Sequence, residues 1–439
     1  MILGDLRKNR VADDRLWEMV NRANHLTTGG YSSWEDNAPV LVPLMERILA
    51  WAKEKEEWQV YFYDMSRLFW LILRDGEKDL RRAFRLAELF HRDSALHIGE
   101  QAGRTAQEWR TQVTAQILGF YLEYPQIDDK KIRQMLDVFR EFHERYGSEW
   151  NNGDYQKVMS LAKLNRDREL AEEAKRKLER ADYENWCYVC YYGLQMIGYH
   201  VLREDPEEVE EMIARLCEKA IPVKYRWCFD QCETAKEAEL VHAAILDCLM
   251  IGRSRMFARF FEKWRGLYEE ADPGEDGDTY RVLLHSLAGD WSRTDERLRL
   301  AEKDDRDRRE GKRTPLDCLY SSLCWYCYFQ MLKEQGTETV WMELGEEEAA
   351  GVFTYTDESE VREEQKDQSN RVESAEAGRQ WLCLEVAAYF ERQADLLGEQ
   401  MDRARKRFEY AKVKRTHEEC FLAGTVGRRI KSISCSEAE

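Results

Sequence analysis

The sequence predicts an all-α protein, and three observations lead to this fold class. Apolar residues recur at intervals of three and four, in blocks of about 15 to 22 residues, which is the period of amphipathic helices. Only 7 Pro and 24 Gly interrupt the 439 residues. Charged residues make up 35% of the chain and aromatic residues 12%, as expected of helices with one solvated face. No alternation of period two is long enough to predict a strand.

The predicted helices follow one another along almost the whole chain. In the first half they cover residues 13–26, 39–55, 57–74, 78–92, 105–122, 129–146, 153–164, 167–181 and 184–203. In the second half they cover residues 206–219, 235–251, 254–271, 278–288, 292–309, 315–335, 338–349, 374–397 and 399–415.

Several connections repeat one scheme, in which an apolar helix ends at a glycine and a second amphipathic helix follows. Gly76, Gly252, Gly289 and Gly336 occupy this position. Because glycine adopts the left-handed backbone that often ends a helix, each of these positions predicts a helical hairpin. Pro206 begins the next helix in an equivalent turn. Hairpins that stack on one another predict an α-solenoid.

One of these turns, Gly289-Asp290-Trp291, resembles the turn between the two antiparallel helices of the tetratricopeptide repeat (TPR) family. Leu298 and Ala301 then fall at the packing positions of that family's second helix. The repeat is degenerate, because bulky residues such as Phe257 stand where the family often has alanine. The resemblance covers residues 57–349. It implies a right-handed α-solenoid of antiparallel helical hairpins (TPR-like) with a concave binding face.

The chain divides by composition into four predicted segments. Residues 1–56 form an N-terminal helical cap, and residues 57–354 form the TPR-like helical repeats. Residues 355–378 are nearly devoid of apolar side chains, which predicts a polar linker or an exposed loop. Residues 379–439 form a C-terminal helix pair and tail that would cover the last apolar face of the solenoid.

The net charge of −18 argues against general binding to nucleic acid and to anionic membranes. It would suit a basic partner. The first residues, MILGDLRKNR, lack the apolar core of a signal peptide, and no run approaches the ~18 apolar residues of a membrane span. Twelve cysteines in such a chain are interpreted as reduced thiols. The sequence therefore predicts a cytoplasmic protein and does not predict its oligomeric state.

Two cysteine pairs are candidates for a metal site. Cys187 and Cys190 share one helix face, and Cys228 and Cys232 could supply a second pair for tetrahedral zinc. The alternative is core packing, because cysteine is small and commonly buried where helices approach closely. A near copy of the first pair at Cys324 favours packing, since one structural position then recurs in the stack. We therefore predict no cofactor and keep zinc as the alternative.

Arg92 and His97 form the second candidate for chemistry. Their R-x4-H spacing resembles the short motif of helical ribonucleases of the HEPN superfamily. In that resemblance both side chains would act on a phosphodiester. The alternative is a charge cluster at the end of a helix, which we prefer, because such a spacing arises readily by chance in a chain rich in arginine. No other catalytic motif is present, and we predict that the protein is not an enzyme.

Aromatic residues crowd two of the predicted hairpins. Not all of them can point into the core of a helix pair, so some are expected on the concave face, where rings favour peptide binding. The candidate binding residues are Trp58, Tyr61, Phe62, Trp70, Trp186, Tyr188, Tyr191 and Tyr192.

The predicted function is that of a non-enzymatic scaffold or regulator, which binds a protein or peptide on a concave, aromatic and acidic face. The alternative is an immunity or antitoxin-like protein that neutralises a basic toxin through the charge of −18. The second alternative is a HEPN-like ribonuclease.

Overall fold

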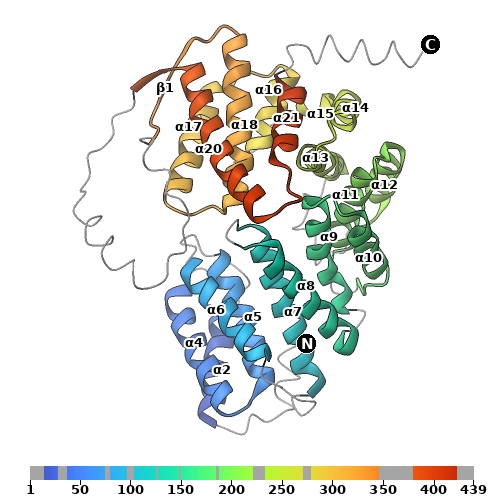
Figure 1. Cartoon of the computed structure of the whole chain (residues 1–439), viewed down its shortest axis with the longest axis vertical. Helices are drawn as coiled ribbons and strands as arrows, with labels where there is room; N and C mark the ends of the chain where they lie inside the picture. Colours follow the sequence, from blue (N-terminus) through green and yellow to red (C-terminus); the bar gives the residue numbers. More distant parts are fainter. Residues whose placement is uncertain are drawn as a thin grey trace. The chain divides into compact units, whose positions relative to one another are not determined.

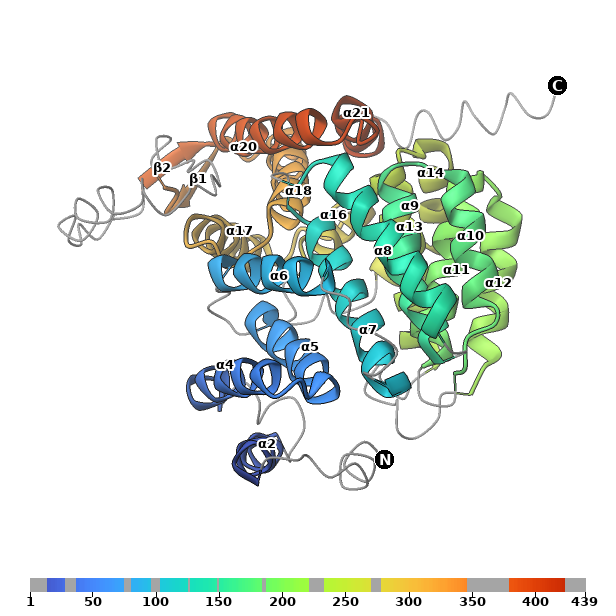
Figure 2. The same cartoon turned by 60° about the horizontal axis from the view of Figure 1, so that its bottom comes forward.

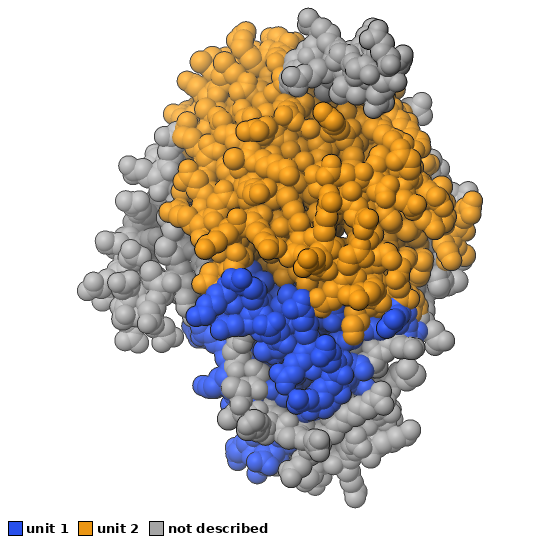
Figure 3. Space-filling model, turned by 45° about the vertical axis from the view of Figure 1, so that its right-hand side comes forward, with its two compact units in different colours: residues 1–121, 130–157, 180–182 blue, residues 122–129, 158–179, 183–439 orange. Residues whose placement is uncertain are grey.

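The computed structural model describes residues 14–27, 37–74, 80–95, 103–124, 127–147, 150–183, 187–220, 233–269, 278–345 and 379–422. These residues are mostly helical, which confirms the all-α prediction apart from one small two-stranded sheet. None of the described helices is long and apolar enough to cross a membrane. The chain forms two compact units (Figure 3).

Unit 1 consists of Met1–Tyr121, Lys130–Lys157 and Arg180–Asp182. Its helices are α2 (Asp14–Leu26), α4 (Ala38–Glu54), α5 (Trp58–Arg74), α6 (Leu80–Ala95), α7 (Gly103–Leu122) and α8 (Asp129–Tyr146), followed by the 3-10 turn η2 (Trp150–Asp154) (Figure 1). Helices α4 and α5 pack as an antiparallel pair, and α6 packs against α5. Their shared core contains Met45, Ile48, Phe69 and Phe90, which are all fully buried.

Unit 2 consists of Leu122–Asp129, Val158–Glu179 and Tyr183–Glu439. Its first elements are α9 (Tyr155–Leu164, from Val158 onward), α10 (Arg168–Leu178), the π-helical turn η3 (Val189–Gly193), α11 (Leu194–Arg203), α12 (Pro206–Glu218), α13 (Glu233–Ile251), α14 (Ser254–Trp264) and α15 (Gly266–Glu269). The remaining elements are α16 (Thr279–Ala288), α17 (Thr294–Arg309), α18 (Pro315–Glu334), β1 (Thr339–Met342), β2 (Arg379–Leu382), α20 (Cys383–Ala404) and α21 (Tyr410–Phe421).

Helix α18 lies at the centre of the core of unit 2. It packs against α16, α17, α20 and α21, as Figures 1 and 2 show. Other helices therefore cover α18 on several sides, which explains why apolar and aromatic residues occur on all of its faces. Trp325 is fully buried, and its indole N–H donates to the Asp304 carboxylate at 2.8 Å.

The predicted glycine turns at Gly252 and Gly289 join two helices, whereas Gly336, with a φ of +95°, is followed by strand β1 and forms no helical hairpin. Gly252 and Gly289 have φ angles of +85° and +107°, in the left-handed region that favours glycine. At the end of α16, Gly289 donates its N–H to the Ser286 carbonyl, and Asp290 donates its own to that of His285. The Asp290 carboxylate then holds Arg297 of α17 at 2.7 Å, so this turn fixes the second helix as well.

The expectation that the chain has no strand is wrong. Residues 338–345, the described part of the predicted helix 338–349, are not helical, because β1 occupies Thr339–Met342 and pairs antiparallel with β2. The sequence TVWM is rich in β-branched and aromatic side chains and alternates exposed and buried residues. Four residues are too few to give a clear signal of period two.

Several predicted helix boundaries also need correction. The predicted helix 184–203 contains the π-turn η3 before α11, and α14 and α15 divide the predicted helix 254–271. The predicted helix 374–397 begins as strand β2, and α20 then continues to Ala404. The last helix is α21, Tyr410–Phe421, instead of 399–415.

Some predictions lie outside the described residues. These are the turn at Gly76 and the linker 355–378. The predicted segment boundaries therefore stay predictions.

The turn between α20 and α21 is anchored by one buried arginine. Arg405 is 1% exposed, and its guanidinium donates to the carbonyls of Leu122, Tyr124 and Ile127, all in unit 2. Burial lowers the pKa of Arg405 to about 10. Three carbonyl acceptors compensate for the loss of water around this charge.

Candidate functional site

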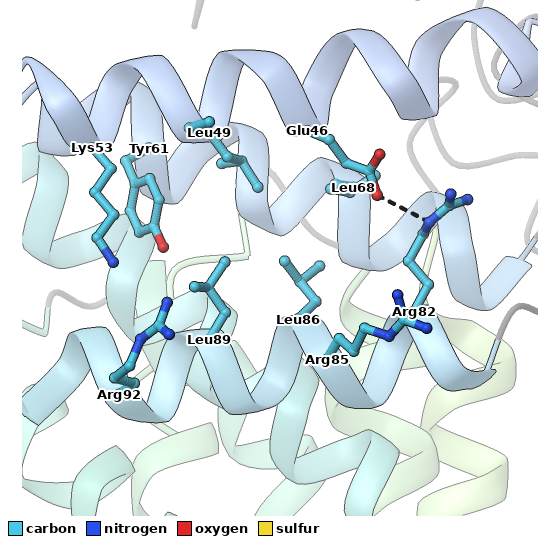
Figure 4. A pocket seen from close by; sticks show the side chains of 11 residues that line it. Glu46, Leu49, Lys53, Tyr61, Leu68, Arg82, Arg85, Leu86, Leu89 and Arg92 are labelled. Carbon is cyan, nitrogen blue, oxygen red and sulfur yellow. Dashed lines mark ion pairs between the residues drawn. The ribbon is translucent and has the colours of Figure 1, made fainter. Parts of the chain in front are cut away.

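A pocket of about 710 Å³ lies in unit 1 between helices α4 and α6. Figure 4 shows the side chains of the two helices pointing toward each other across it. Helix α5 contributes Tyr61 and Leu68. The other lining residues are Glu46, Leu49, Ala50 and Lys53 from α4, and Arg82, Arg85, Leu86, Leu89 and Arg92 from α6.

The helical period places these residues on facing stripes. Arg82, Arg85, Leu89 and Arg92 are spaced by three, four and three residues, so they share one face of α6. Glu46, Leu49 and Lys53 follow the same spacing on α4. Each helix therefore presents alternating leucine and charged side chains to the pocket.

A buried carboxylate supports the pocket at the Lys53 end. The side chain of Asp93 is fully buried and accepts hydrogen bonds from Lys53 Nζ at 2.5 Å and from the Tyr61 hydroxyl. Arg92 Nε lies 3.5 Å from the same carboxylate. Burial, together with Asp93, raises the pKa of Tyr61 above its usual value, so its phenol stays protonated. Tyr61 and Asp93 thereby fix the position of Lys53.

The pocket combines positive charge with apolar surface. Four cationic side chains and one carboxylate, that of Glu46, line it. Glu46 binds Arg82 at 2.9 Å, while Arg92 is 70% exposed. Leu49, Leu68 and Leu86 are less than 9% exposed and form the apolar part of the lining. Such an arrangement attracts an anion that also carries an apolar group.

The aromatic residues predicted as binding residues on the first hairpin are largely part of the core. Tyr61 and Phe62 are fully buried, and Trp58 packs on both at ring-centroid distances of 5.7 and 6.3 Å. Trp58 and Trp70 are half-buried. Of this group, Tyr61 is the residue that lines the pocket, where its hydroxyl holds Asp93.

The second predicted aromatic group lies around the π-turn η3 of unit 2. The rings of Tyr188 and Tyr192 stack at 4.8 Å, and Tyr183 meets both edge-on. Lys219 Nζ lies 5.2 Å from the centre of the Tyr188 ring. Tyr188, Tyr191 and Tyr192 are half-buried, and Trp186 lies outside the described residues. The rings of Tyr188 and Tyr192 thus already pack against each other and against Tyr183.

The cysteine candidates are only partly described. Cys187 is 1% exposed and Cys190 is half-buried, while Cys228 and Cys232 lie outside the described residues. Cys324 and Cys327 are fully buried in α18, where burial raises the pKa of both thiols well above the usual value. Because zinc binds thiolates, these two thiols suit core packing. Within the described ranges, no group of three or more His, Cys, Asp and Glu side chains could hold a metal ion.

The predicted pair Arg92 and His97 is described only at Arg92, which lines the pocket. His97 lies outside the described residues. The carboxylate that follows the arginine, Asp93, is fully buried and paired with Lys53 and Tyr61.

No protein-family model, no curated protein and no solved structure matches this chain. The family resemblance therefore stays a prediction.

Most of the residues that form the pocket were missed by the sequence interpretation, which singled out only Tyr61 and Arg92. The signal was present, because the arginines at 82, 85 and 92 share one helical face with Leu89. Their partner stripe on α4 could not be found in the same way. Only the fold shows that α4 faces α6.

Proposed function

We propose that the chain is a non-enzymatic protein-binding protein, and that the pocket of unit 1 binds an acidic segment of a partner. The observation that carries this proposal is the gathering of Lys53, Arg82, Arg85 and Arg92 around one pocket, in a chain whose net charge is −18. In an acidic protein, a local cluster of cations directs a negatively charged ligand to that place.

The leucines of the lining favour a peptide over RNA. Half-buried Leu89 offers apolar area to a peptide that alternates acidic and apolar residues, and Leu49 and Leu86, which are 4% and 6% exposed, form the apolar floor behind it. Recognition of single-stranded RNA relies on stacking of bases on aromatic rings. The aromatic ring in this pocket, Tyr61, is fully buried and offers no such face.

The ribonuclease alternative would use Arg92 in the same pocket with His97. The position of Arg92 on a cationic pocket agrees with contact to a phosphodiester. In the ribonuclease motif a polar residue follows the arginine. That residue is Asp93 here, and its pairing with Lys53 argues against a catalytic role for it. RNA binding is therefore treated as a competing outcome of the experiment below.

The immunity alternative draws its support from the net charge of −18, which suits a basic partner. It concerns the acidic surface as a whole, whereas the pocket has the opposite sign. The two interactions would be separable by the charge of the ligand.

The TPR-like architecture belongs to this proposal as well. Its support is the pairing of α13 with α14 around Gly252, and the turn at Gly289 that leads from α16 toward α17. In such a stack, the half-exposed rings of Tyr188, Tyr191 and Tyr192 are candidates for a further contact with the partner.

The test is the binding of three fluorescent probes to the full chain. They are a twelve-residue peptide of alternating Glu and Leu, the same peptide with Lys in place of Glu, and a single-stranded RNA of equal charge. We expect the acidic peptide to bind best and to weaken as the salt concentration rises. Arg85→Glu should weaken it about tenfold, equivalent to about 1.4 kcal/mol.

The matched control is Arg145→Glu on α8. Arg145 is 63% exposed and pairs with Glu141, and it is not among the residues that line the pocket. Equal affinity of the acidic peptide for both variants would overturn the proposed site. Tighter binding of RNA, with its cleavage lost in Arg92→Ala, would overturn the proposal in favour of the ribonuclease.

A further inference from the structure

Exposed apolar side chains gather at the small sheet of unit 2. Among the described residues, four large hydrophobic side chains are exposed, and three of them are Trp341 at 67%, Leu382 at 49% and Leu384 at 46%. Trp341 lies in β1 and Leu382 in β2, while Leu384 follows in the first turn of α20. Such a concentration of exposed apolar side chains around one small sheet points to a contact surface.

The register of the sheet places Trp341 and Leu382 on the same face. Trp341 pairs with Gln380, and Thr339 pairs with Leu382, so these four side chains share one side of the ladder. A hydrogen bond from Gln380 Nε2 to the Thr339 hydroxyl at 3.0 Å agrees with this assignment. The opposite face carries Val340 and Met342, which are 6% and 0% exposed.

The outer edge of β1 has no backbone partner among the described residues at Thr339 and Trp341, whereas the N–H of Glu343, just beyond the strand, donates to Glu302 of α17. Cys383 donates its N–H to the Glu338 carbonyl at 3.0 Å, so these opposed residues form a hydrogen-bonded pair. Every second pair of the ladder is hydrogen-bonded, and the next ones are therefore Val340 with Trp381 and Met342 with Arg379. The backbone groups of Thr339 and Trp341 therefore point away from β2. The sheet has two strands in the order β1-β2, so no third strand among the described residues pairs with this edge. Figure 2 shows the two strands at the N-terminal end of α20.

The usual protections of an exposed edge are missing within β1 itself. The strand TVWM contains neither proline nor a charged residue, and an unprotected edge invites pairing with another chain. A two-stranded sheet is also marginally stable in water and gains from a third strand.

The charges around the strand select the partner. Glu338 and Glu343 stand at the two ends of β1, and both are exposed. Glu338 is paired with Lys333 at 2.5 Å, and Arg379 lies opposite Met342 in the ladder, so Glu343 is the flanking carboxylate that a basic partner meets first. Glu302 lies close by, because its carboxylate accepts the N–H of Glu343 at 2.8 Å. An extended segment with basic residues would meet these carboxylates, whereas a second copy of this chain would bring more acidic residues and a second charge of −18.

We propose that a basic, extended segment of a partner protein adds a third strand to the outer edge of β1 and packs an apolar side chain on Trp341 and Leu382. Backbone hydrogen bonds to Thr339 and Trp341 would provide the pairing. An apolar side chain of the added strand would lie beside Trp341, and lysine or arginine would lie beyond the two ends of β1, near Glu343 and Glu338. This site is independent of the pocket in unit 1.

The test uses a fluorescent ten-residue peptide of alternating Lys and Val, with an acidic version that has Glu in place of Lys. We expect the basic peptide to bind the full chain and to protect the amides of Thr339 and Trp341 from hydrogen exchange. A peptide with N-methylated backbone on its pairing edge should bind at least tenfold more weakly, because strand addition requires its N–H groups.

Three variants separate the parts of the proposal. Trp341→Ala removes the apolar contact without a change of charge, and Glu343→Lys reverses one charge; each should weaken binding about fivefold to tenfold. Thr339→Pro removes the N–H of residue 339, which points away from β2. An edge strand tolerates proline at such a position. Glu310→Lys, on an exposed residue that pairs with Lys312, is the charge control and should leave binding unchanged.

Three outcomes would overturn the proposal. The first is equal binding of the basic peptide to the wild type and to Trp341→Ala. The second is equal binding of the acidic and basic peptides. The third is a dimer in analytical ultracentrifugation that Trp341→Ala dissociates, because a second copy would then be the occupant of the edge.

Discussion

Two buried aspartates, one in each unit, have similar hydrogen-bond and ion-pair partners, but the surroundings of these partners differ. Asp93 in unit 1 and Asp305 in unit 2 are both fully buried, and each accepts a hydrogen bond from a tyrosine hydroxyl. Around Asp305, Arg308 and Arg309 bind at 2.8 and 3.1 Å, and the Gly345 N–H donates at 3.1 Å. These contacts join α17, α20 and the segment after β1.

The cations around the two carboxylates differ in their access to water. Arg308 and Arg309 are 10% and 29% exposed, whereas Lys53 and Arg92 beside Asp93 are 32% and 70% exposed. The network of Asp305 is thus the more closed of the two and holds helices together. The network of Asp93 is open on one side and presents its cations to the pocket. Both networks contain a buried aspartate. We infer that the accessibility of the cations distinguishes the proposed binding site at Asp93 from the purely structural contact at Asp305.

The largest expected effect is that of Asp305→Ala. The change leaves Arg308 buried without its counter-charge, and such losses cost about 3 to 5 kcal/mol. Amide hydrogen exchange in α17 and α20 should show this loss of protection. Glu310→Ala on the same helix end is the control and should stay within about 0.5 kcal/mol. A small effect of Asp305→Ala would mean that the closed network does not stabilise unit 2.

The second prediction concerns pH and has opposite signs for two carboxylates, Asp154 in unit 1 and Asp305 in unit 2. Burial raises the pKa of Asp154 in unit 1 to about 7, and its Oδ2 atom has no hydrogen-bond partner. Between about pH 4 and pH 7 the folded state keeps a proton that the unfolded state has lost. The stability of unit 1 should therefore fall as the pH rises through this range, by at most about 1.4 kcal/mol per pH unit.

Asp154→Asn should reduce this slope, most clearly above pH 6, because burial also raises the pKa of Asp64 in the same unit to about 6. Hydrogen exchange in α8 as a function of pH measures the change. For Asp305, burial alone would raise the pKa, but Arg308 and the hydrogen bonds from Tyr389 and Gly345 lower it below its usual value. Asp305 therefore adds to the free energy of unfolding at pH values above the pKa of an unfolded aspartate. This contribution is lost as the pH falls toward the lower pKa of the folded state. Equal changes of the pH profile in Asp154→Asn and Asp305→Asn would contradict the comparison.

The smallest expected effect is that of Asp93→Asn, and it sharpens the comparison most. Asparagine keeps the shape and can still accept from Tyr61, but Lys53 loses its counter-charge. We expect unit 1 to lose about 1 to 3 kcal/mol. Because the pocket gains positive charge, affinity for the acidic peptide should rise a few-fold in titrations monitored by fluorescence. Asp137→Asn, on an exposed residue of α8, is the control. A fall in affinity with unit 1 still folded would contradict the proposed role.

The sequence predicted the helices well where their period was strong and their ends were marked. Trp58–Arg74 and Pro315–Glu334 differ from the predicted ranges by one residue at an end, and the glycines at 252 and 289 end helices as expected. The strand at Thr339–Met342 was missed, because four residues carry too little periodicity and the pairing partner lies 37 residues beyond Met342.

The candidate site was harder to predict, because proximity in the fold decides it. Arg92 was recognised for a spacing to His97, whereas in the fold its neighbours across the pocket include Lys53 on another helix. Tyr61 was expected on an open face but supports Asp93 from within the core. Side chains that meet across two helices leave no local pattern in the sequence.

The most direct test of the central claim is a charge swap across the pocket. The peptide of alternating Glu and Leu and its version with Lys in place of Glu are titrated against the wild type and against Arg85→Glu. We expect the variant to lose affinity for the acidic peptide about tenfold and to gain affinity for the basic one. Arg145→Glu should change neither preference. If Arg85→Glu changes both affinities no more than Arg145→Glu does, the pocket between α4 and α6 is not the binding site.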